Sequence, residues 1–144
     1  MNIDIALTAP QKEFVFCGDK SPALVAGLGA GKTYAATIRF VLQMLQEPGI
    51  NVLMGMPTYD LLKLRAIPGF EEALDLVGIP YKTNKSDYSI QILGHGIIYF
   101  RSYDRPERWI AFEVAKTLLD ELDTLPKNKA ELVWRKATER TRQK

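Results

Sequence analysis

The sequence has one cysteine and one histidine among its 144 residues. A single cysteine, Cys17, excludes a disulfide within the chain and suits a reducing compartment. The histidine, His95, has no partner at a spacing typical of metal ligands. We find no signal peptide, internal repeat, low-complexity segment or apolar run long enough to span a membrane. These absences argue against a disulfide-stapled secreted domain and a membrane protein, and we expect a cytoplasmic one.

Positive and negative charges nearly balance along the chain. The net charge is +2, which creates no overall field that demands a nucleic-acid partner. The distribution is uneven, because basic residues outnumber acidic ones in segment 127–144. Hydrophobic residues make up 47% of the chain, enough for a core. The length is that of one domain, so we expect a single domain over residues 1–144.

Predicted helices and strands alternate along the chain. Gly94-His95 is expected to form the turn of a hairpin. Strands separated by helices favour a parallel sheet. We therefore predict an α/β fold in which a mostly parallel β-sheet is flanked by helices, with a β-hairpin insertion. The expected helices are 10–16, 33–45, 59–64, 70–77 and 126–142, and the expected strands are 21–26, 51–56, 88–93, 96–101 and 116–119.

A glycine-rich segment joins the first predicted strand to the second predicted helix. Its glycines let consecutive backbone N–H groups point at a phosphate, and the helix adds the positive end of its dipole. Lys32 is expected to reach the β- and γ-phosphates and the Thr33 hydroxyl to bind Mg²⁺. Ala26 departs from the strict pattern, which has glycine there. The segment predicts a P-loop (Walker A motif) whose nucleotide-binding residues are Gly27, Gly29, Ala30, Gly31, Lys32 and Thr33.

The segment Thr117-Leu118-Leu119-Asp120-Glu121 has the pattern of a Walker B motif. Asp120 is predicted to hold Mg²⁺, and Glu121 to orient and deprotonate the attacking water. Two acids after leucines also occur in solvated loops, but the P-loop upstream favours the catalytic interpretation. An acid directly after the Walker B aspartate is typical of additional-strand P-loop ATPases that use a catalytic glutamate.

Gln11 is a candidate for reading the base. A glutamine amide can both donate to and accept from an adenine edge, and Gln11 lies a short segment upstream of Lys32. An exposed glutamine at a helix start is the alternative.

A guanine-specific site is disfavoured by spacing. Residues 75–78 and 84–87 read as D-x-x-G and N-K-x-D, the motifs of GTPases. They lie too close together for a strand–helix–strand unit between them. Asp75 falls in a helical pattern, and segment 84–87 is typical of a turn.

Taken in order, these motifs resemble the ATPase domain of the terminase large subunits of tailed bacteriophages. The resemblance extends from about Leu7 to the end of the chain. Its remaining elements are Arg101-Ser102, Pro106-Glu107-Arg108 and Asp120 to Pro126. Leu28 stands where many members carry an arginine. The resemblance implies Mg²⁺ and ATP hydrolysis coupled to the translocation of double-stranded DNA into a procapsid, in the cytoplasm of an infected bacterial host.

The resemblance also implies partners. They are a homo-oligomeric, pentameric ring, a portal protein and a small terminase subunit, with no membrane. The chain ends before the family's coupling motif and nuclease domain, so we expect a fragment that is weakly active or inactive alone. Arg140 and Arg142 are candidates for an arginine that acts on a neighbouring subunit, a solvated helix face being the alternative. The other function kept open is a helicase-like P-loop ATPase acting on nucleic acid.

Overall fold

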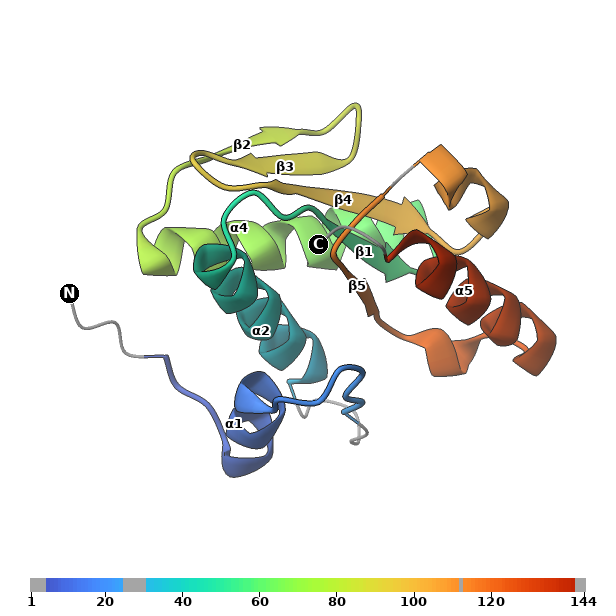
Figure 1. Cartoon of the computed structure of the whole chain (residues 1–144), viewed down its shortest axis with the longest axis horizontal. Helices are drawn as coiled ribbons and strands as arrows, with labels where there is room; N and C mark the ends of the chain where they lie inside the picture. The colour runs from blue at the N-terminus through green and yellow to red at the C-terminus, as the bar shows by residue number, and fades with distance from the viewer. Residues whose placement is uncertain (1–4, 25–30, 112, 142–144) are drawn as a thin grey trace.

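The computed structural model describes residues 5–24, 31–111 and 113–141, and they form a five-stranded sheet packed between helices (Figure 1). None of the helices in this part of the chain is long and apolar enough to cross a membrane. In chain order the elements are α1 (Ala9–Phe16), α2 (Lys32–Gln46), β1 (Val52–Met56), α3 (Tyr59–Leu61), the π-helix η1 (Leu62–Ala66), α4 (Ile67–Val77), β2 (Tyr81–Asn84), β3 (Ser89–Ile92), β4 (Ile97–Ser102), the 3-10 helix η2 (Pro106–Ala111), β5 (Lys116–Leu119), the 3-10 helix η3 (Leu122–Thr124) and α5 (Lys127–Arg140).

The strand order is β2-β3-β4-β1-β5. Strand β1 pairs in parallel with both β4 and β5, whereas β2, β3 and β4 pair antiparallel. The predicted α/β fold and the hairpin are thus confirmed, and the antiparallel part makes the sheet mixed. All five residues of β1 are buried, as expected for a strand covered on both faces.

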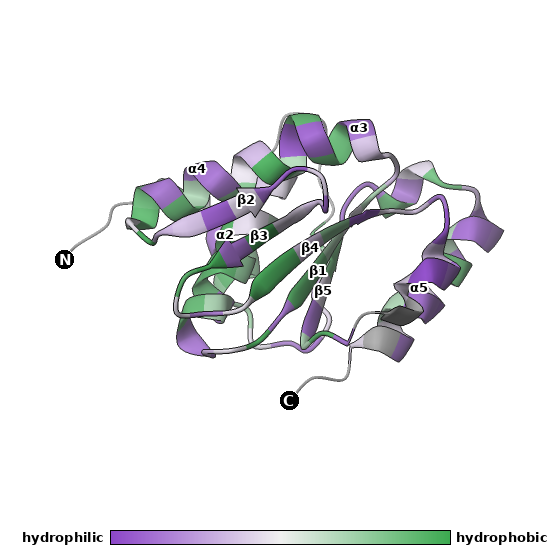
Figure 2. Ribbon diagram, turned by 90° about the horizontal axis from the view of Figure 1, so that it is seen from above, coloured by the Kyte–Doolittle hydropathy of each residue, from purple (hydrophilic) through white to green (hydrophobic). Residues whose placement is uncertain are grey.

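Helices cover the sheet unequally. Helices α2 and α4 lie on one face and α5 lies on the other (Figures 1 and 2). Alternate residues of β1 therefore enter different cores: Met54 packs with α2 and α4, and Leu53 packs with Trp109 and Val133. The carboxyl ends of β1 and β5 lie between these two layers, at the edge where ligands bind in such sheets.

Several predicted boundaries needed correction. Segment 21–26 was expected to be a strand, but Ser21–Leu24 is not in one, and residues 25 and 26 lie outside the described part. Pro22 has no N–H to donate to a ladder, and Ser21 and Ala23 are exposed. The sequence also missed β2, in which exposed and half-buried residues alternate without a hydrophobic run.

The helical region 59–77 is continuous and was expected to be interrupted at Pro68-Gly69. Pro68 lies in the first turn of α4, where its missing N–H costs little. The π-helix η1 directly precedes α4.

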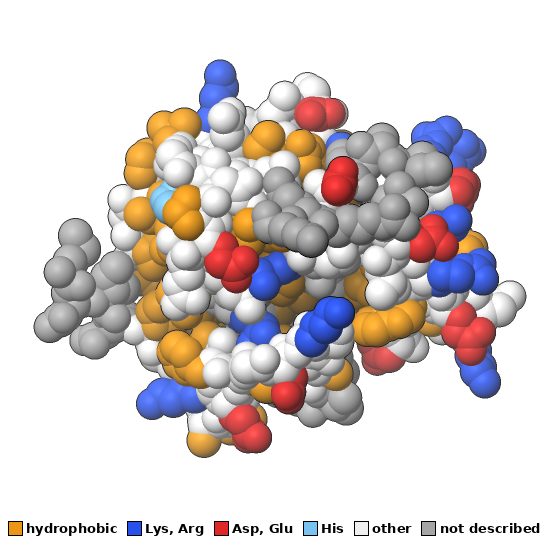
Figure 3. Space-filling view, in the orientation of Figure 1, with side chains coloured by type: hydrophobic (Ala, Val, Ile, Leu, Met, Phe, Trp, Pro, Cys, Tyr) orange, Lys and Arg blue, Asp and Glu red, His pale blue; other side chains and the backbone are white. Residues whose placement is uncertain are grey.

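The described part of the basic segment near the end of the chain also carries acidic side chains. Lysine, arginine, aspartate and glutamate side chains are interspersed on the side of the molecule where α5 lies (Figures 1 and 3). Lys136 and Glu139, for example, form an ion pair at 3.5 Å within α5.

Candidate active site

Helix α2 begins at the predicted phosphate-binding residues. Its N-cap is Gly31, whose φ of 73° is left-handed and therefore favours glycine. No side chain caps this end, so the N–H groups of the first turn have no capping oxygen from the described part of the protein. Lys32 and Thr33 lie in that turn. The other predicted phosphate-binding residues, Gly27, Gly29 and Ala30, lie outside the described residues.

The structure brings Thr33 and Asp120 together from distant parts of the sequence. The Thr33 hydroxyl donates a hydrogen bond to Oδ2 of Asp120 at 2.5 Å. Asp120 follows β5, and its N–H continues the pairing with β1 by donating to the carbonyl of Gly55. The strand thus carries the carboxylate to the N-terminus of α2.

This pair of oxygens fits a magnesium ion. Mg²⁺ takes oxygen ligands at about 2.0–2.1 Å in an octahedron, so neighbouring ligand oxygens lie about 2.9 Å apart. The hydroxyl of Thr33 and Oδ2 of Asp120 need to separate by only a few tenths of an ångström to become such neighbours. Mg²⁺ is commonly held by one or two protein oxygens together with phosphate and water, which matches this donor set.

Glu121, the predicted base, forms an ion pair that the sequence did not predict. Its Oε1 lies 3.1 Å from Nη1 of Arg65, with the arginine side chain 62% and the glutamate side chain 30% exposed. Arg65 comes from η1, the π-turn that follows β1. The sequence offered one indication that Arg65 could reach the site: it lies after the carboxyl end of a predicted strand, and that end of each parallel strand faces the site.

The backbone of Glu121 is itself unusual. Its φ of 54° places a non-glycine residue in the left-handed region. Its N–H donates to Oδ1 of Asp120 at 2.9 Å, so the carboxylate of Asp120 contacts both Thr33 and the following peptide. Strained residues of this kind are often found at active sites.

Gln11 lies beside the phosphate-binding end of α2. It completes a capping box with Thr8: its Oε1 accepts from the Thr8 N–H at 2.8 Å. Its Nε2 donates to the carbonyl of Gly31 at 3.2 Å. Gln11 is therefore a buried link between α1 and the residue that begins α2, and its predicted contact with adenine stays a prediction.

Arg39 holds α1 against α2, a role that the sequence did not reveal. The guanidinium is buried and donates to carbonyls at the C-terminal end of α1, including those of Phe14 and Cys17 at 2.8 Å. Those carbonyls carry the negative end of the helix dipole and offset the buried charge.

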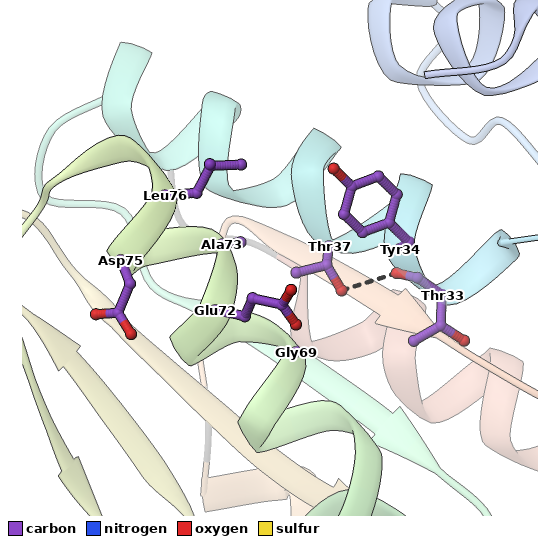
Figure 4. Close-up of a pocket in the computed structure, with 8 residues that line it drawn as sticks. All are labelled: Thr33, Tyr34, Thr37, Gly69, Glu72, Ala73, Asp75 and Leu76. Carbon is purple, nitrogen blue, oxygen red and sulfur yellow. Dashed lines mark hydrogen bonds between the residues drawn. The ribbon is translucent and has the colours of Figure 1, made fainter. Parts of the chain in front are cut away.

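A pocket of about 540 Å³ opens next to Thr33, between α2 and α4 (Figure 4). It carries two carboxylates, from Glu72 and Asp75, which would repel a triphosphate. We therefore place the phosphates at the N-terminus of α2 and not in this pocket. The residues that line it are Thr33, Tyr34 and Thr37 from α2 and Gly69, Glu72, Ala73, Asp75 and Leu76 from α4.

Two other sets of residues are not part of the site described here. Asp75 lies within α4, and segment 84–87 begins at the last residue of β2 and continues into the turn before β3, in agreement with the rejection of a guanine site. Arg140 is the last residue of α5, and Arg142 lies outside the described residues. Their predicted action on a neighbouring subunit stays a prediction.

Comparisons with known proteins agree on one family. Residues 23–144 match the family model described as terminase large subunit, T4likevirus-type, N-terminal. No curated protein sequence matched the chain.

Solved structures of large terminases are similar in fold. The large terminase from a thermophilic bacteriophage superposes with a TM-score of 0.73 at 17% identity, over 93% of this chain and 37% of that one. The same terminase in complex with ADP superposes with a TM-score of 0.74 at 20% identity, over 93% of this chain and 36% of that one. The large terminase ATPase domain of Thermus phage P74-26 superposes with a TM-score of 0.64 at 20% identity, over 80% of this chain and 51% of that one. The chain thus spans between about a third and half of the length of these proteins.

Proposed function

Since the chain belongs to the terminase large subunits of the T4-like-virus type, as part of their N-terminal region, we propose that it is the ATP-hydrolysing motor domain of a viral DNA-packaging machine. The observation that carries this proposal is the hydrogen bond between Thr33 and Asp120 at 2.5 Å. It joins the start of the P-loop helix to the end of the Walker B strand, the two places where P-loop enzymes bind the metal and phosphates of a nucleotide.

The phosphates would be bound by the first turn of α2. Its N–H groups and the positive end of the helix dipole attract an anion, and Lys32 adds a full positive charge. Thr33 and Asp120 would hold Mg²⁺. That ion, when bound, neutralises charge on the phosphates and so makes the terminal phosphorus easier to attack.

Glu121 would then act as the base. Its carboxylate can take a proton from a water molecule as the water attacks. In the structure this carboxylate is paired with Arg65. We propose that the terminal phosphate competes for Arg65, which leaves Glu121 available to the water only when nucleotide is present.

The wider function rests on family membership. The substrate moved would be double-stranded DNA, and the assembly a homo-oligomeric ring that contacts a portal protein and a small terminase subunit. The site of action would be the cytoplasm of an infected bacterial host. Arg140 and Arg142 are candidates for an arginine that completes a neighbour's site.

The experiment is to measure Mg-ATP binding, ATP hydrolysis and DNA packaging with the protein that carries this chain, as wild type and as Lys32→Ala. Removal of one charge-assisted contact costs about 1.5–3 kcal/mol. Affinity for Mg-ATP should therefore fall about ten- to a hundredfold, and packaging should stop. Lys12→Ala, which changes an exposed lysine of α1, should leave all three unchanged.

Unchanged ATP binding in Lys32→Ala would contradict the proposed nucleotide site. ATP-driven strand separation without DNA uptake into procapsids would contradict the packaging function and favour a helicase-like ATPase.

A further inference from the structure

Tyr103 is a buried tyrosine whose hydroxyl lies next to the two acids of the candidate site. It directly follows β4, and its backbone N–H donates to the carbonyl of Met56 at the end of β1. Its side chain is only 1% exposed. The hydroxyl lies 2.7 Å from the carbonyl oxygen of Asp120 and 2.8 Å from that of Gly55.

The residues around Tyr103 leave space for its ring at this position. A Cβ atom on Gly55 would lie 2.6 Å from Cε1 of Tyr103, so the ring can lie against β1 only because residue 55 has no side chain. Trp109 packs against the ring as well, with ring centroids 6.1 Å apart. Glycine in a buried central strand is otherwise unfavourable, which indicates that the close approach matters.

The hydroxyl carries one proton and faces two carbonyl acceptors. The carbonyl of Gly55 already accepts the N–H of Asp120 at 3.0 Å, as part of the pairing between β1 and β5. The carbonyl of Asp120 lies beyond that pairing, because the chain turns into the left-handed conformation at Glu121. In the described part of the chain, the donor that reaches it is the Tyr103 hydroxyl.

The peptide between Asp120 and Glu121 is therefore held on both sides. Its carbonyl accepts from Tyr103, and its N–H donates to Oδ1 of Asp120. The orientation of this peptide fixes two things at once: the rotation of the Asp120 carboxylate toward Thr33, and the direction in which Glu121 leaves the strand. Burial, and then the negative charge of Asp120, raise the pKa of Tyr103, so the hydroxyl keeps its proton and stays a donor.

We propose that Tyr103 is a positioning residue for ATP hydrolysis, whose hydroxyl fixes the peptide that joins Asp120 to Glu121 and so aims the base at the attacking water. This inference rests on the proposed function. Tyr103 acts through the backbone of the two acids and not through a side chain of theirs. Small displacements of a catalytic group can cost large factors in rate, while the charge of Asp120 and the phosphate contacts of Lys32 and α2 are retained, so binding changes little.

The test is Tyr103→Phe in the protein that carries this chain. The variant keeps the ring and its packing and removes only the hydroxyl. A small misplacement of the base is expected to lower kcat about tenfold or more. The dissociation constant of Mg-ATP should stay within about twofold of wild type. The matched control is Tyr81→Phe on β2, which is the edge strand opposite β5. It removes a hydroxyl that contacts Asp75 of α4 and should leave kcat unchanged.

Two results would overturn the proposal. One is a kcat for Tyr103→Phe equal to that of wild type. The other is a parallel loss of kcat, nucleotide binding and melting temperature, which would mean that the hydroxyl only stabilises the fold. Glu121→Gln measured alongside separates this proposal from the proposed function. If Glu121→Gln hydrolyses ATP as wild type does, the proposed function is wrong; if it is inactive while Tyr103→Phe is fully active, only the role of Tyr103 is wrong.

Discussion

Asp120→Asn is predicted to change the magnesium dependence of ATP binding in a direction that only a metal-binding carboxylate explains. Asparagine has nearly the same shape, and its oxygen can still accept from the N–H of Glu121, as Oδ1 of Asp120 does at 2.9 Å. Its amide group can face the Thr33 hydroxyl, which now lies 2.5 Å from Oδ2. The variant should therefore fold, and the change is mainly the loss of one negative charge.

The two expected effects on ATP binding have opposite signs. Without magnesium, Asp120 repels the triphosphate. Two unit charges about 6 Å apart interact by about 3 kcal/mol at an effective dielectric constant of about 20. Because Asp120 is half-buried, solvent reduces this to about 1–2 kcal/mol, and metal-free ATP should bind Asp120→Asn roughly five- to thirtyfold more tightly than wild type.

With magnesium the order should reverse. Loss of an anionic ligand removes a charge-assisted contact of about 1.5–3 kcal/mol, so Mg-ATP should bind roughly ten- to a hundredfold more weakly. Calorimetric titration with ATP, once with Mg²⁺ present and once with Mg²⁺ chelated, measures the affinities for Mg-ATP and for metal-free ATP. Asp104→Asn, an exposed aspartate in the turn after β4, is the control. If wild type and Asp120→Asn show the same ratio of affinities with and without Mg²⁺, Asp120 is not a metal ligand.

Three further predictions concern residues that support the site. Gln11→Ala removes hydrogen bonds to Thr8 and Gly31, so the free energy of unfolding measured in urea should fall by about 1–3 kcal/mol. ATP binding should weaken more than GTP binding. Equal losses for the two nucleotides would mean that Gln11 does not read the base. Gly55→Ala places Cβ 2.6 Å from Tyr103 and should destabilise the fold by about 1–3 kcal/mol. The control is Gly18→Ala, in which no atom lies within 4 Å of the new Cβ. Equal free energies of unfolding for the two variants would refute the packing argument. Burial and the charge of Asp120 raise the pKa of Tyr103 above its usual 10.0, so the folded state holds this proton more tightly than the unfolded state. The resulting stabilisation is complete below about pH 10 and declines above it. Above pH 10 the free energy of unfolding should therefore fall less in Tyr103→Phe than in wild type.

Much of the site could be predicted because local sequence determines it. Thr8 and Gln11 form a capping box that starts α1 where the pattern predicted a helix. The apolar pair Leu118-Leu119 followed by two acids predicted β5 and its polar end with the correct bounds. Thr33 and Asp120 were each predicted to bind Mg²⁺ from their own motifs, and the structure places them in contact.

The rest depends on tertiary contacts that leave no periodic signal. Arg65 and Glu121 come from segments far apart in the sequence, and no residue pattern announces the π-helix in which Arg65 lies. The left-handed conformation of Glu121 depends on hydrogen bonds to the peptide before it, including one from Tyr103, which is distant in sequence. Strand β2 was missed because an edge strand needs only one buried face, and its own is only half-buried.

The most direct test of the central claim is the rate of phosphate release by Glu121→Gln in the protein that carries this chain, at saturating Mg-ATP. Glutamine keeps the size of the side chain but cannot take a proton from water. The lost ion pair with Arg65 is largely exposed, so stability should fall by no more than about 1 kcal/mol. We predict that Mg-ATP binds as it does to wild type while hydrolysis falls by about 10²–10⁴. A Glu121→Gln variant that hydrolyses ATP at the wild-type rate would contradict the assignment of the base, and with it the active site described above.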